Sequence, residues 1–445
     1  MSRRPTSKPL PTQPVNAAIT SFAHDGRGVA HVNGKATFIH GALPGEEVDF
    51  VYTGIHRDYD EGRVDAVHLA SPDRVEPHCA HYGICGGCSL QHLGTEAQVA
   101  AKQALLLDQL QRIGKVEAAS LLPPLTCQVW GYRQKARLSV KYVAKKGRVL
   151  VGFRERASPL LAALDYCPVL HPDMGTRLLE LGDVLIKLSV RDRIPQLEVA
   201  IGEAEGRAVI IRLLAELTEE DREILRAYEP ASGFTIYLQR QGPDSVQPLS
   251  PEKAPPLFYS LPDHDLRFEF LPNDFTQVNF QINRLMVERV LALLDLQPSD
   301  KLLDLYCGLG NFTLPMARQA QHVTGVEGSK VSVERARHNA RLNGVGNVEF
   351  HVADLATPQD KSPWSQSRYD KVLLDPSRAG AFEILQYMKN WQPARVVYVS
   401  CNPSTLARDA GYLVNELGYR LTAAGIMDMF PHTSHVESLA VFEKW

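Results

Sequence analysis

The chain has 445 residues, of which 44% are hydrophobic and 22% are charged, as in an ordinary globular protein. Single cores stop growing at roughly 250–300 residues, so this length predicts two to four domains. The absence of any run of about 18 apolar residues argues against a membrane span, and seven cysteines in so long a chain argue against a disulfide scaffold and favour a reducing, cytoplasmic location.

The first 72 residues predict an arm followed by a small β-barrel. Residues 1–14 are basic and proline-rich and lack the apolar core of a secretory signal, which predicts a short disordered arm. Within residues 15–72, tight turns separate five short strand-like runs: 19–23, 29–32, 36–39, 48–53 and 63–69. Five such strands are typical of an oligonucleotide-binding barrel, although a purely structural β-domain has the same pattern.

Four cysteines indicate a metal in the next region, which we assign to residues 73–270. Three lie in a glycine-rich loop and the fourth precedes a proline: Cys79, Cys85, Cys88 and Cys167. Four thiolates suit an iron–sulfur cluster or structural zinc, and the Cys-Pro pair and uneven spacing favour iron–sulfur. The wide first spacing and the fourth thiol argue against radical enzymes, whose clusters leave one iron open. Cys127 and Cys307 are interpreted as structural.

A helix is expected directly after the cysteine loop. Thr95 and Gln98 have the spacing of a capping box, and Gly114 is placed to end the helix as a C-cap. Residues 125–265 alternate between β-like and mixed segments, and this pattern does not set an order for their strands.

Residues 130–156 form a strongly basic stretch. It contains nine Lys or Arg against one acid, interleaved with aromatic side chains. Such a composition suits phosphate contacts combined with stacking on unpaired RNA bases. The alternative is a solvated face of a sheet.

The last region, residues 271–445, predicts an α/β fold. Five strand-like runs alternate there with helical stretches: 301–306, 322–326, 347–353, 371–374 and 396–400. This alternation is typical of βαβ units and of a parallel, doubly wound sheet. Two further runs, 419–427 and 436–442, leave no room for a crossover helix and should therefore pair antiparallel.

A site for an adenosyl ligand is predicted where the first of these strands ends. The segment 304–312 contains two glycines that let the backbone approach a ligand closely, although a structural glycine turn looks alike. Glu327 ends the second strand, where a carboxylate can bind ribose hydroxyls, and Asp354 ends the third, within reach of an adenine amino group. Thr313 replaces the third glycine of a dinucleotide motif, and a sulfonium donor needs no pyrophosphate cradle. Both features favour S-adenosylmethionine over NAD.

Asp375, Cys401 and Glu437 are expected to meet beyond the carboxyl ends of the strands. Asn402 and Pro403 predict a helix that begins after Cys401, and its positive end should lower the pKa of the thiol. The thiolate could add to C6 of uracil and make C5 nucleophilic toward a methyl donor, after which Glu437 would remove the C5 proton. Asp375 could hold the polar edge of the uracil. A buried structural cysteine and a surface carboxylate are the alternatives.

The chain resembles the bacterial RNA uracil-5-methyltransferase family over nearly its whole length. Six segments carry the resemblance: 79–88, 275–279, 304–311, 374–378, 399–403 and 428–437. Within that family, the barrel together with the cysteine cluster resembles enzymes that join a TRAM domain to an iron–sulfur domain and methylate uridine 1939 of 23S rRNA. The resemblance implies a class I, Rossmann-like methyltransferase fold for residues 271–445.

The resemblance also implies a role for each candidate residue. Cys401 would be the nucleophile and Glu437 the base. S-adenosylmethionine would be bound by Gln277, Tyr306, Asn311, Glu327, Asp354 and Asp375. A 4Fe–4S cluster, which we expect to be architectural because the chemistry needs no electron, would be bound by Cys79, Cys85, Cys88 and Cys167. The expected partner is 23S rRNA, and the expected enzyme is a cytoplasmic monomer without a membrane or an obligate protein partner.

Three other interpretations stay open. The same chemistry could act on another uridine of rRNA or tRNA. A non-catalytic RNA-binding assembly factor is a second class, which the intact Cys401, Asp375 and Glu437 argue against. A DNA cytosine C5-methyltransferase is a third, but its nucleophile follows the fourth strand in a Pro-Cys pair, whereas this strand ends in Asp375–Arg378.

Overall fold

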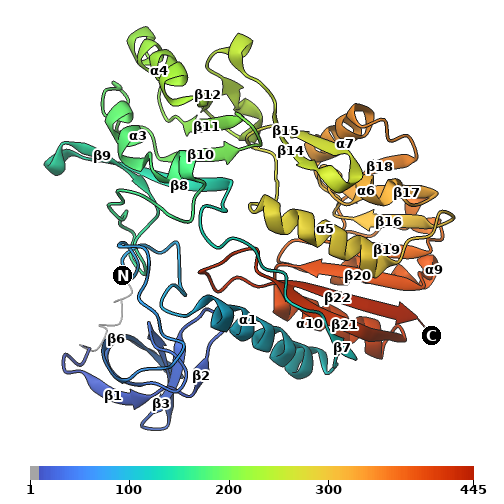
Figure 1. Ribbon diagram of the computed structural model, residues 1–445, viewed down its shortest axis with the longest axis horizontal. Coiled ribbons are helices and arrows are strands. Elements are labelled where there is room, and N and C mark those ends of the chain that lie inside the picture. The colour runs from blue at the N-terminus through green and yellow to red at the C-terminus, as the bar shows by residue number, and fades with distance from the viewer. Residues whose placement is uncertain (1–9, 445) are drawn as a thin grey trace, which may run out of the picture. The chain divides into compact units, whose positions relative to one another are not determined.

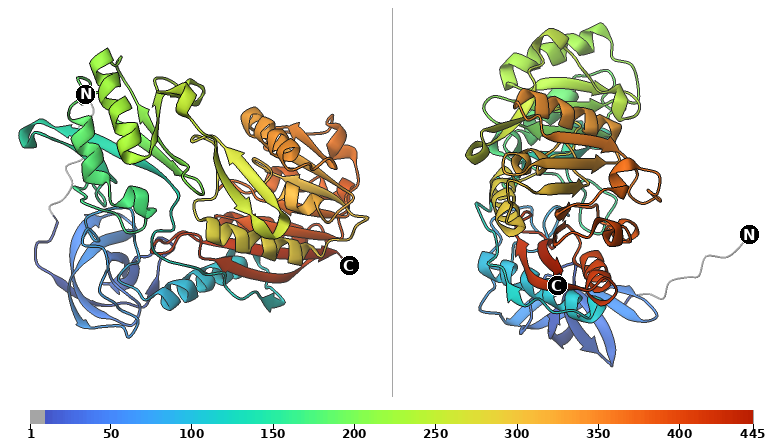
Figure 2. Two further views of the ribbon diagram at one scale, coloured as in Figure 1. Left: turned by 45° about the horizontal axis from the view of Figure 1, so that its top comes forward. Right: turned by 90° about the vertical axis from the view of Figure 1, so that its right-hand side faces the viewer.

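The computed structural model describes residues 10–444, so most of the predicted arm at residues 1–14 lies outside the described part. The chain forms two compact units, residues 1–102 with 431–435 and residues 103–430 with 436–445 (Figures 1 and 2). This division groups the predicted barrel with the cysteine loop and the rest of the central region with the methyltransferase region. None of the described helices combines the length and apolarity that crossing a membrane requires.

The first unit contains six strands rather than the five expected. They form one sheet in the order β1-β5-β6-β4-β3-β2, with bounds β1 (Val15–Ala18), β2 (Ser21–Phe22), β3 (Gly28–Val32), β4 (Lys35–His40), β5 (Glu47–Ile55) and β6 (Tyr59–Leu69). Of the strand predicted at residues 19–23, only β2 is present. The chain leaves the sheet around Ile19, and the additional strand β1, which precedes it, pairs antiparallel with β5. Ile39, Val48 and Phe50 are fully buried in the core of this sheet.

Helix α1 (Thr95–Gln109) begins where the sequence predicted, but Gln98 does not close a capping box. Its buried side-chain amide donates to the carbonyl oxygens of Leu90 (3.0 Å) and Leu93 (2.8 Å). Its side-chain oxygen accepts a hydrogen bond from the amide of His432 (2.8 Å). Gln98 therefore ties the end of the cysteine loop to the segment 431–435 within the first unit.

Replacing Gln98 by alanine should destabilise the first unit by about 2–4 kcal/mol, because a buried backbone group left without a partner costs about 1–3 kcal/mol. Urea unfolding should show a lower midpoint for this variant than for the parent protein. Glu96→Gln changes an exposed side chain of the same helix and serves as the control. Equal midpoints for Gln98→Ala and the parent would contradict the role assigned to this amide.

The second unit begins with the sheet that the sequence left unordered. Its six strands run in the order β13-β12-β11-β10-β8-β9. Helix α2 (Pro172–Gly175) is short, α3 (Leu178–Leu185) packs against β9, and α4 (Glu219–Ser232) packs against β12. The strands of this sheet and of the hairpin that follows are β8 (Lys135–Val143), β9 (Arg148–Gly152), β10 (Gln196–Ile201), β11 (Arg207–Arg212), β12 (Thr235–Gln239), β13 (Gln247–Pro248), β14 (Leu257–Leu261) and β15 (Leu266–Phe270).

An eight-stranded sheet completes the second unit, in the order β18-β17-β16-β19-β20-β22-β21-β7. Its strands are β7 (Ser120–Leu121), β16 (Lys301–Leu305), β17 (His322–Glu327), β18 (Val348–Val352), β19 (Lys371–Leu374), β20 (Arg395–Ser400), β21 (Tyr419–Met427) and β22 (Glu437–Lys444). The strands from β16 to β20 pair in parallel, and β22 pairs antiparallel with both β20 and β21. The predicted doubly wound sheet with an antiparallel end is therefore confirmed.

Helices lie on both faces of this sheet in Figure 2, as a doubly wound fold requires. They are α5 (Phe280–Leu294), α6 (Thr313–Ala317), α7 (Lys330–Leu342), α8 (Phe382–Leu385), α9 (Met388–Trp391) and α10 (Pro403–Asn415). The central strands are buried along their length: every residue of β19 and all but the first of β16 and β20 are buried. Such buried and mainly apolar strands are typical of a parallel sheet covered on both faces.

The start of α10 is held by a close contact with the end of α1. Helix α1 continues as a π-helical turn, Leu110–Gly114, and Lys115 (φ 55°) is the left-handed residue that caps it. Gly114 is therefore not the C-cap that the sequence predicted. A Cβ atom on Gly114 would lie 2.5 Å from the Ala407 carbonyl oxygen, so this residue must be glycine for the two helices to approach.

Candidate active site

The ends of β19, β20 and β22 bring three predicted site residues together. Cys401 follows β20, and Glu437 begins β22, whose Ser438 lies opposite Ser400 in the antiparallel pair. Asp375 follows β19, the parallel neighbour of β20 on its other side. A thiol and two carboxylates therefore lie at one edge of the sheet, as the sequence predicted.

The chain after Cys401 turns directly into α10. Asn402 is the N-cap, its side-chain oxygen accepts a hydrogen bond from the Ser404 amide (3.1 Å), and Pro403 is the first helical residue. The Asn402 side-chain amide also donates to the carbonyl oxygen of Arg378 (3.0 Å). The predicted cap is confirmed, and it holds the loop after β19 beside the loop after β20.

The predicted lowering of the thiol pKa is wrong for the ligand-free protein. Burial raises the pKa of Cys401 to about 11, and the negative charges of Glu437 and Asp375 add to this rise. Arg378 opposes it. The helix N-terminus does not outweigh burial and two neighbouring carboxylates, which the one-dimensional spacing could not reveal.

Both carboxylates also titrate near neutral pH. Burial and then the charge of Asp375 raise the pKa of Glu437 to about 8, although Arg378 opposes the rise. Burial and then the charge of Glu327 raise the pKa of Asp375 to about 7. A carboxylate with such a pKa accepts a proton far more readily than an exposed one does, which suits a general base.

Arg378 is a functional candidate that the sequence reasoning did not assign. It is the cation that opposes the pKa rise of both Cys401 and Glu437, so it stabilises the charged forms of both groups. Its position three residues after Asp375, in a strand-end loop, was a signal that could have identified it.

The loop after β16 forms the expected backbone cradle. Tyr306, Gly308 and Gly310 have positive φ angles of 65°, 55° and 93°, which turn the chain sharply into α6. Glu327, at the end of β17, accepts hydrogen bonds from the amides of Gly308 (3.2 Å) and Ser329 (2.8 Å). A Cβ atom built on Gly308 would meet nothing within 4 Å, so the cradle is open at this point.

Comparison with known proteins now decides the family. A family model described as tRNA (Uracil-5-)-methyltransferase matches residues 258–358 and 362–445, and a TRAM domain model matches residues 12–51. The chain is 57% identical over all of its length to a protein of Methylococcus capsulatus named 23S rRNA (uracil(1939)-C(5))-methyltransferase RlmD, which it covers completely. The chain belongs to the RNA uracil-C5-methyltransferase family. A protein of the same name from Alkalilimnicola ehrlichii is 52% identical over 98% of both chains.

A solved structure supports the fold of this uracil-C5-methyltransferase. The Pyrococcus abyssi tRNA (uracil-54, C5)-methyltransferase in complex with S-adenosyl-L-homocysteine aligns with a TM-score of 0.71 at 26% identity. The alignment covers 96% of this chain and 99% of that structure. The class I methyltransferase fold and the N-terminal TRAM barrel inferred from the sequence are thereby confirmed.

Asp304 is a buried carboxyl group in β16, the strand that leads into the cradle of the methyltransferase. It is fully buried at the end of β16, its Oδ2 accepts a hydrogen bond from Thr313, and its Oδ1 has no hydrogen-bond partner among the described residues. Burial, together with the charges of Asp375 and Glu327, raises its pKa to about 7 although the hydrogen bond from Thr313 lowers it. Three carboxylates around one cradle fit a ligand that carries positive charge, such as a sulfonium with an α-ammonium group.

Asp304→Asn should stabilise the ligand-free methyltransferase by up to about 4 kcal/mol at pH 8.5, given about 1.4 kcal/mol per pKa unit. The folded pKa of about 7 lies above the usual value of 3.8, so the stability due to the protonated carboxyl is fully present below 3.8 and is lost as the pH rises through 7. Thermal melts at pH 5 and 8.5 should show a smaller pH dependence for the variant than for the parent. The exposed Asp354→Asn is the control, and a parent-like pH dependence in Asp304→Asn would refute the assignment.

The remaining predicted cofactor residues lie around the same cradle or beside it. Gln277 is half-buried in the loop before α5. An ion pair between Asp274 of this loop and Arg335 of α7 fixes the loop in place. Asn311 is held through its side chain by Tyr259 and Asn283, so protein partners already occupy its polar atoms. Asp354 is exposed after β18, and burial raises the pKa of the Tyr306 hydroxyl above its usual range. Their contacts with a cofactor stay predictions.

The cysteine loop of the first unit has features that suit a thiolate cluster. Three cysteines lie in this loop: Cys79 is buried, and Cys85 and Cys88 are half-buried. The Gly87 amide donates to the sulfur of Cys85 (3.4 Å), a kind of contact that tunes iron–sulfur clusters. Cys167, in the second unit, is also half-buried. The described part of the chain contains no group of three or more His, Cys, Asp or Glu side chains arranged to hold a metal ion.

Proposed function

We propose that this chain transfers a methyl group from S-adenosylmethionine to C5 of a uridine in 23S rRNA, the one numbered 1939 in the names of its relatives. The observation that carries the proposal is the buried sheet edge where Cys401 follows β20 and Glu437 begins the antiparallel neighbour β22. A thiol paired with a raised-pKa carboxylate is what C5 methylation needs and what N-methylation does not.

The chemistry follows from the positions of these groups. The Cys401 thiolate adds to C6 of the uracil, and the electron pair of the C5–C6 bond is displaced into an enolate. S-adenosylmethionine would supply the methyl group: C5 takes the methyl carbon as the carbon–sulfur bond of the sulfonium breaks, and the electron pair of that bond stays on sulfur. The Glu437 carboxylate takes the C5 proton, and the electrons of the C5–H bond reform the double bond as the thiolate leaves C6. The target base must leave its stack, because both carbons react from the face of the ring.

The residues proposed to hold the two cofactors are those of the family pattern. Gln277, Tyr306, Asn311, Glu327, Asp354 and Asp375 would surround S-adenosylmethionine, and Cys79, Cys85, Cys88 and Cys167 would bind a 4Fe–4S cluster. The glycine-rich loop with its three cysteines and the amide contact to Cys85 support the cluster. We also propose the division into an arm (1–14), a TRAM barrel (15–72), a central domain (73–270) and a methyltransferase domain (271–445), with a monomer in the cytoplasm.

The test mixes Glu437→Gln protein with unmodified 23S rRNA and S-adenosylmethionine and resolves the products on a denaturing gel. Because the variant cannot take the C5 proton, a covalent protein–RNA band should accumulate, and it should be absent from the Glu437→Gln, Cys401→Ala double variant. A band with tRNA but not with 23S rRNA would support the covalent mechanism and would show that the substrate is a tRNA. No band with either RNA would overturn the covalent mechanism proposed for this chain.

A further inference from the structure

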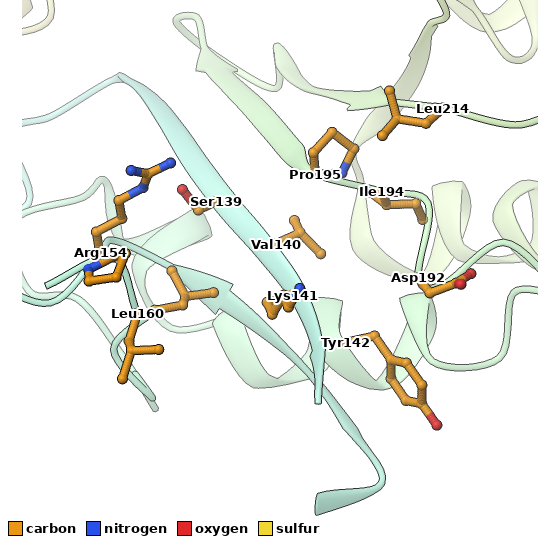
Figure 3. A pocket seen from close by; sticks show the side chains of 12 residues that line it. Ser139, Val140, Lys141, Tyr142, Arg154, Leu160, Asp192, Ile194, Pro195 and Leu214 are labelled. Carbon is orange, nitrogen blue, oxygen red and sulfur yellow. The ribbon is translucent and has the colours of Figure 1, made fainter. Parts of the chain in front are cut away.

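A cavity of about 470 Å³ lies in the central region of the second unit, and none of its lining residues belongs to the candidate active site. It forms where β8 runs past the end of β10 and continues only as a hairpin with β9. In Figure 3, β8 crosses the cavity, the loop before β10 borders it with Ile194 and Pro195, and the chain after β9 borders it with Arg154 and Leu160. The volume is suited to one nucleotide-sized ligand.

Two large apolar side chains border this cavity and face solvent. Leu160 is 63% exposed and Leu214 is 54% exposed, and Figure 3 places them on opposite sides of the cavity. Exposed apolar side chains that lie together around a cavity are typical of a site that binds a ligand. A flat aromatic ring, such as an unpaired base, would cover both leucines.

The charges around the cavity favour an anion. Lys141 and Arg154 line it with exposed side chains, and among the described lining residues Asp192 is the only acid. The β8–β9 hairpin beside the cavity adds three exposed cations, Lys145, Lys146 and Arg148, and it contains no acidic residue.

The structure also shows which cations of the stretch 130–156 already have partners in the protein. Lys135 is mostly buried, which lowers its pKa to about 8, and it donates to the carbonyl oxygen of Asp274. Arg133 donates to the Lys135 carbonyl oxygen, and Arg137 pairs with Glu198. The basic surface expected from the sequence is therefore concentrated at the cavity and the hairpin beside it.

We propose that this cavity binds one unpaired nucleotide of the RNA substrate, other than the methylated one, with its base between Leu160 and Leu214 and its phosphate on Lys141 and Arg154. The proposal rests on the proposed function, because that function makes RNA the ligand of this unit. Such a contact outside the reacting site would set the register of the RNA and so help to choose the target uridine.

Cross-linking tests the occupant directly. A photoreactive p-benzoylphenylalanine in place of Leu160, in the full-length protein, should cross-link to one main nucleotide of unmodified 23S rRNA. The control places the same group at Leu179, an exposed leucine of α3 outside the cavity. Cross-links at position 160 that are as sparse or as scattered as those at 179 would overturn the proposal.

Binding measurements test the two parts of the ligand. Leu214→Asp should raise KM for the RNA about ten-fold, because it replaces an apolar contact with a negative charge, and Leu179→Asp should not. Lys141→Ala with Arg154→Ala should lower the slope of log affinity against log salt by about 0.7–0.9, the value for one phosphate contact. Lys187→Ala, an exposed lysine outside the cavity, is the charge control.

The outcomes separate this proposal from the proposed function. An unchanged KM and salt slope in the cavity variants, with the Glu437→Gln adduct still forming on 23S rRNA, would overturn the cavity proposal alone. A single cross-linked nucleotide at position 160 without an adduct on any RNA would support the cavity proposal and overturn the methylation mechanism.

Discussion

Replacing Cys401 by alanine should abolish methyl transfer to 23S rRNA, with a loss of turnover on the order of 10⁴-fold or more, as when other enzymes lose a nucleophile. Without the sulfur nothing adds to C6, and C5 of an unactivated uracil does not attack the donor. The measurement is the incorporation of labelled methyl groups from S-adenosylmethionine into unmodified 23S rRNA. Binding of the RNA should change little, because the thiol forms its bond after the RNA is bound.

Cys127→Ala is the matched control for this prediction. Cys127 is also a half-buried thiol of the second unit, but it contacts the side chain of Asn279 and lies outside the edge formed by β19, β20 and β22. Its loss should leave turnover within a few-fold of the parent. A Cys401→Ala protein that still turned over at a similar rate would exclude the covalent route and would favour direct attack on the donor.

The positions of the site residues could be predicted because they follow strand ends. In a doubly wound sheet the carboxyl ends of parallel strands share one edge, so recognising the strands placed Glu327, Asp375 and Cys401 together. Glu437 was harder, because its strand runs antiparallel. The short distance between the runs 419–427 and 436–442 was sufficient, since it allowed no crossover helix.

The electrostatics of the site could not be predicted in the same way. The sequence showed a helix start after Cys401, and the cap at Asn402 is as expected. The thiol pKa nevertheless rises, because it depends on how many atoms bury the sulfur and on two carboxylates contributed by distant segments. Periodicity and spacing contain no information about such contacts until the strands are paired.

Long-range contacts also account for the errors in the first 120 residues. Gln98 matched a capping box in sequence, but its amide instead binds carbonyl groups of the cysteine loop and the amide of His432, more than 300 residues away. Gly114 matched a C-cap, but a close contact with α10 explains why glycine stands at this position.

The strand order of the central sheet could not be predicted, because β11 and β12 pair in parallel while its other strands pair antiparallel.

The ligand-free enzyme should hold Cys401 almost entirely as the unreactive thiol at pH 8. A pKa of about 11 leaves about one thiolate in a thousand, whereas an exposed cysteine with a pKa of about 8.5 is about one quarter ionised. Alkylation of Cys401 by iodoacetamide, followed by mass spectrometry of its peptide, should therefore be about two orders of magnitude slower than that of an exposed thiol at pH 8. The rate should keep rising about ten-fold per pH unit up to pH 10.

The charges named as causes of this pKa can be separated by two variants. Glu437→Gln removes a carboxylate that is ionised above pH 8 and raises the thiol pKa, so alkylation at pH 9 should become faster. Arg378→Gln removes the opposing cation, so alkylation should become slower. Burial is the largest cause and is unchanged in both variants, so neither should restore the reactivity of an exposed thiol. Rapid alkylation of the parent at pH 8 would show that the thiol is activated before any ligand binds; slow alkylation that responds to these two substitutions would show that activation has to come with the substrates.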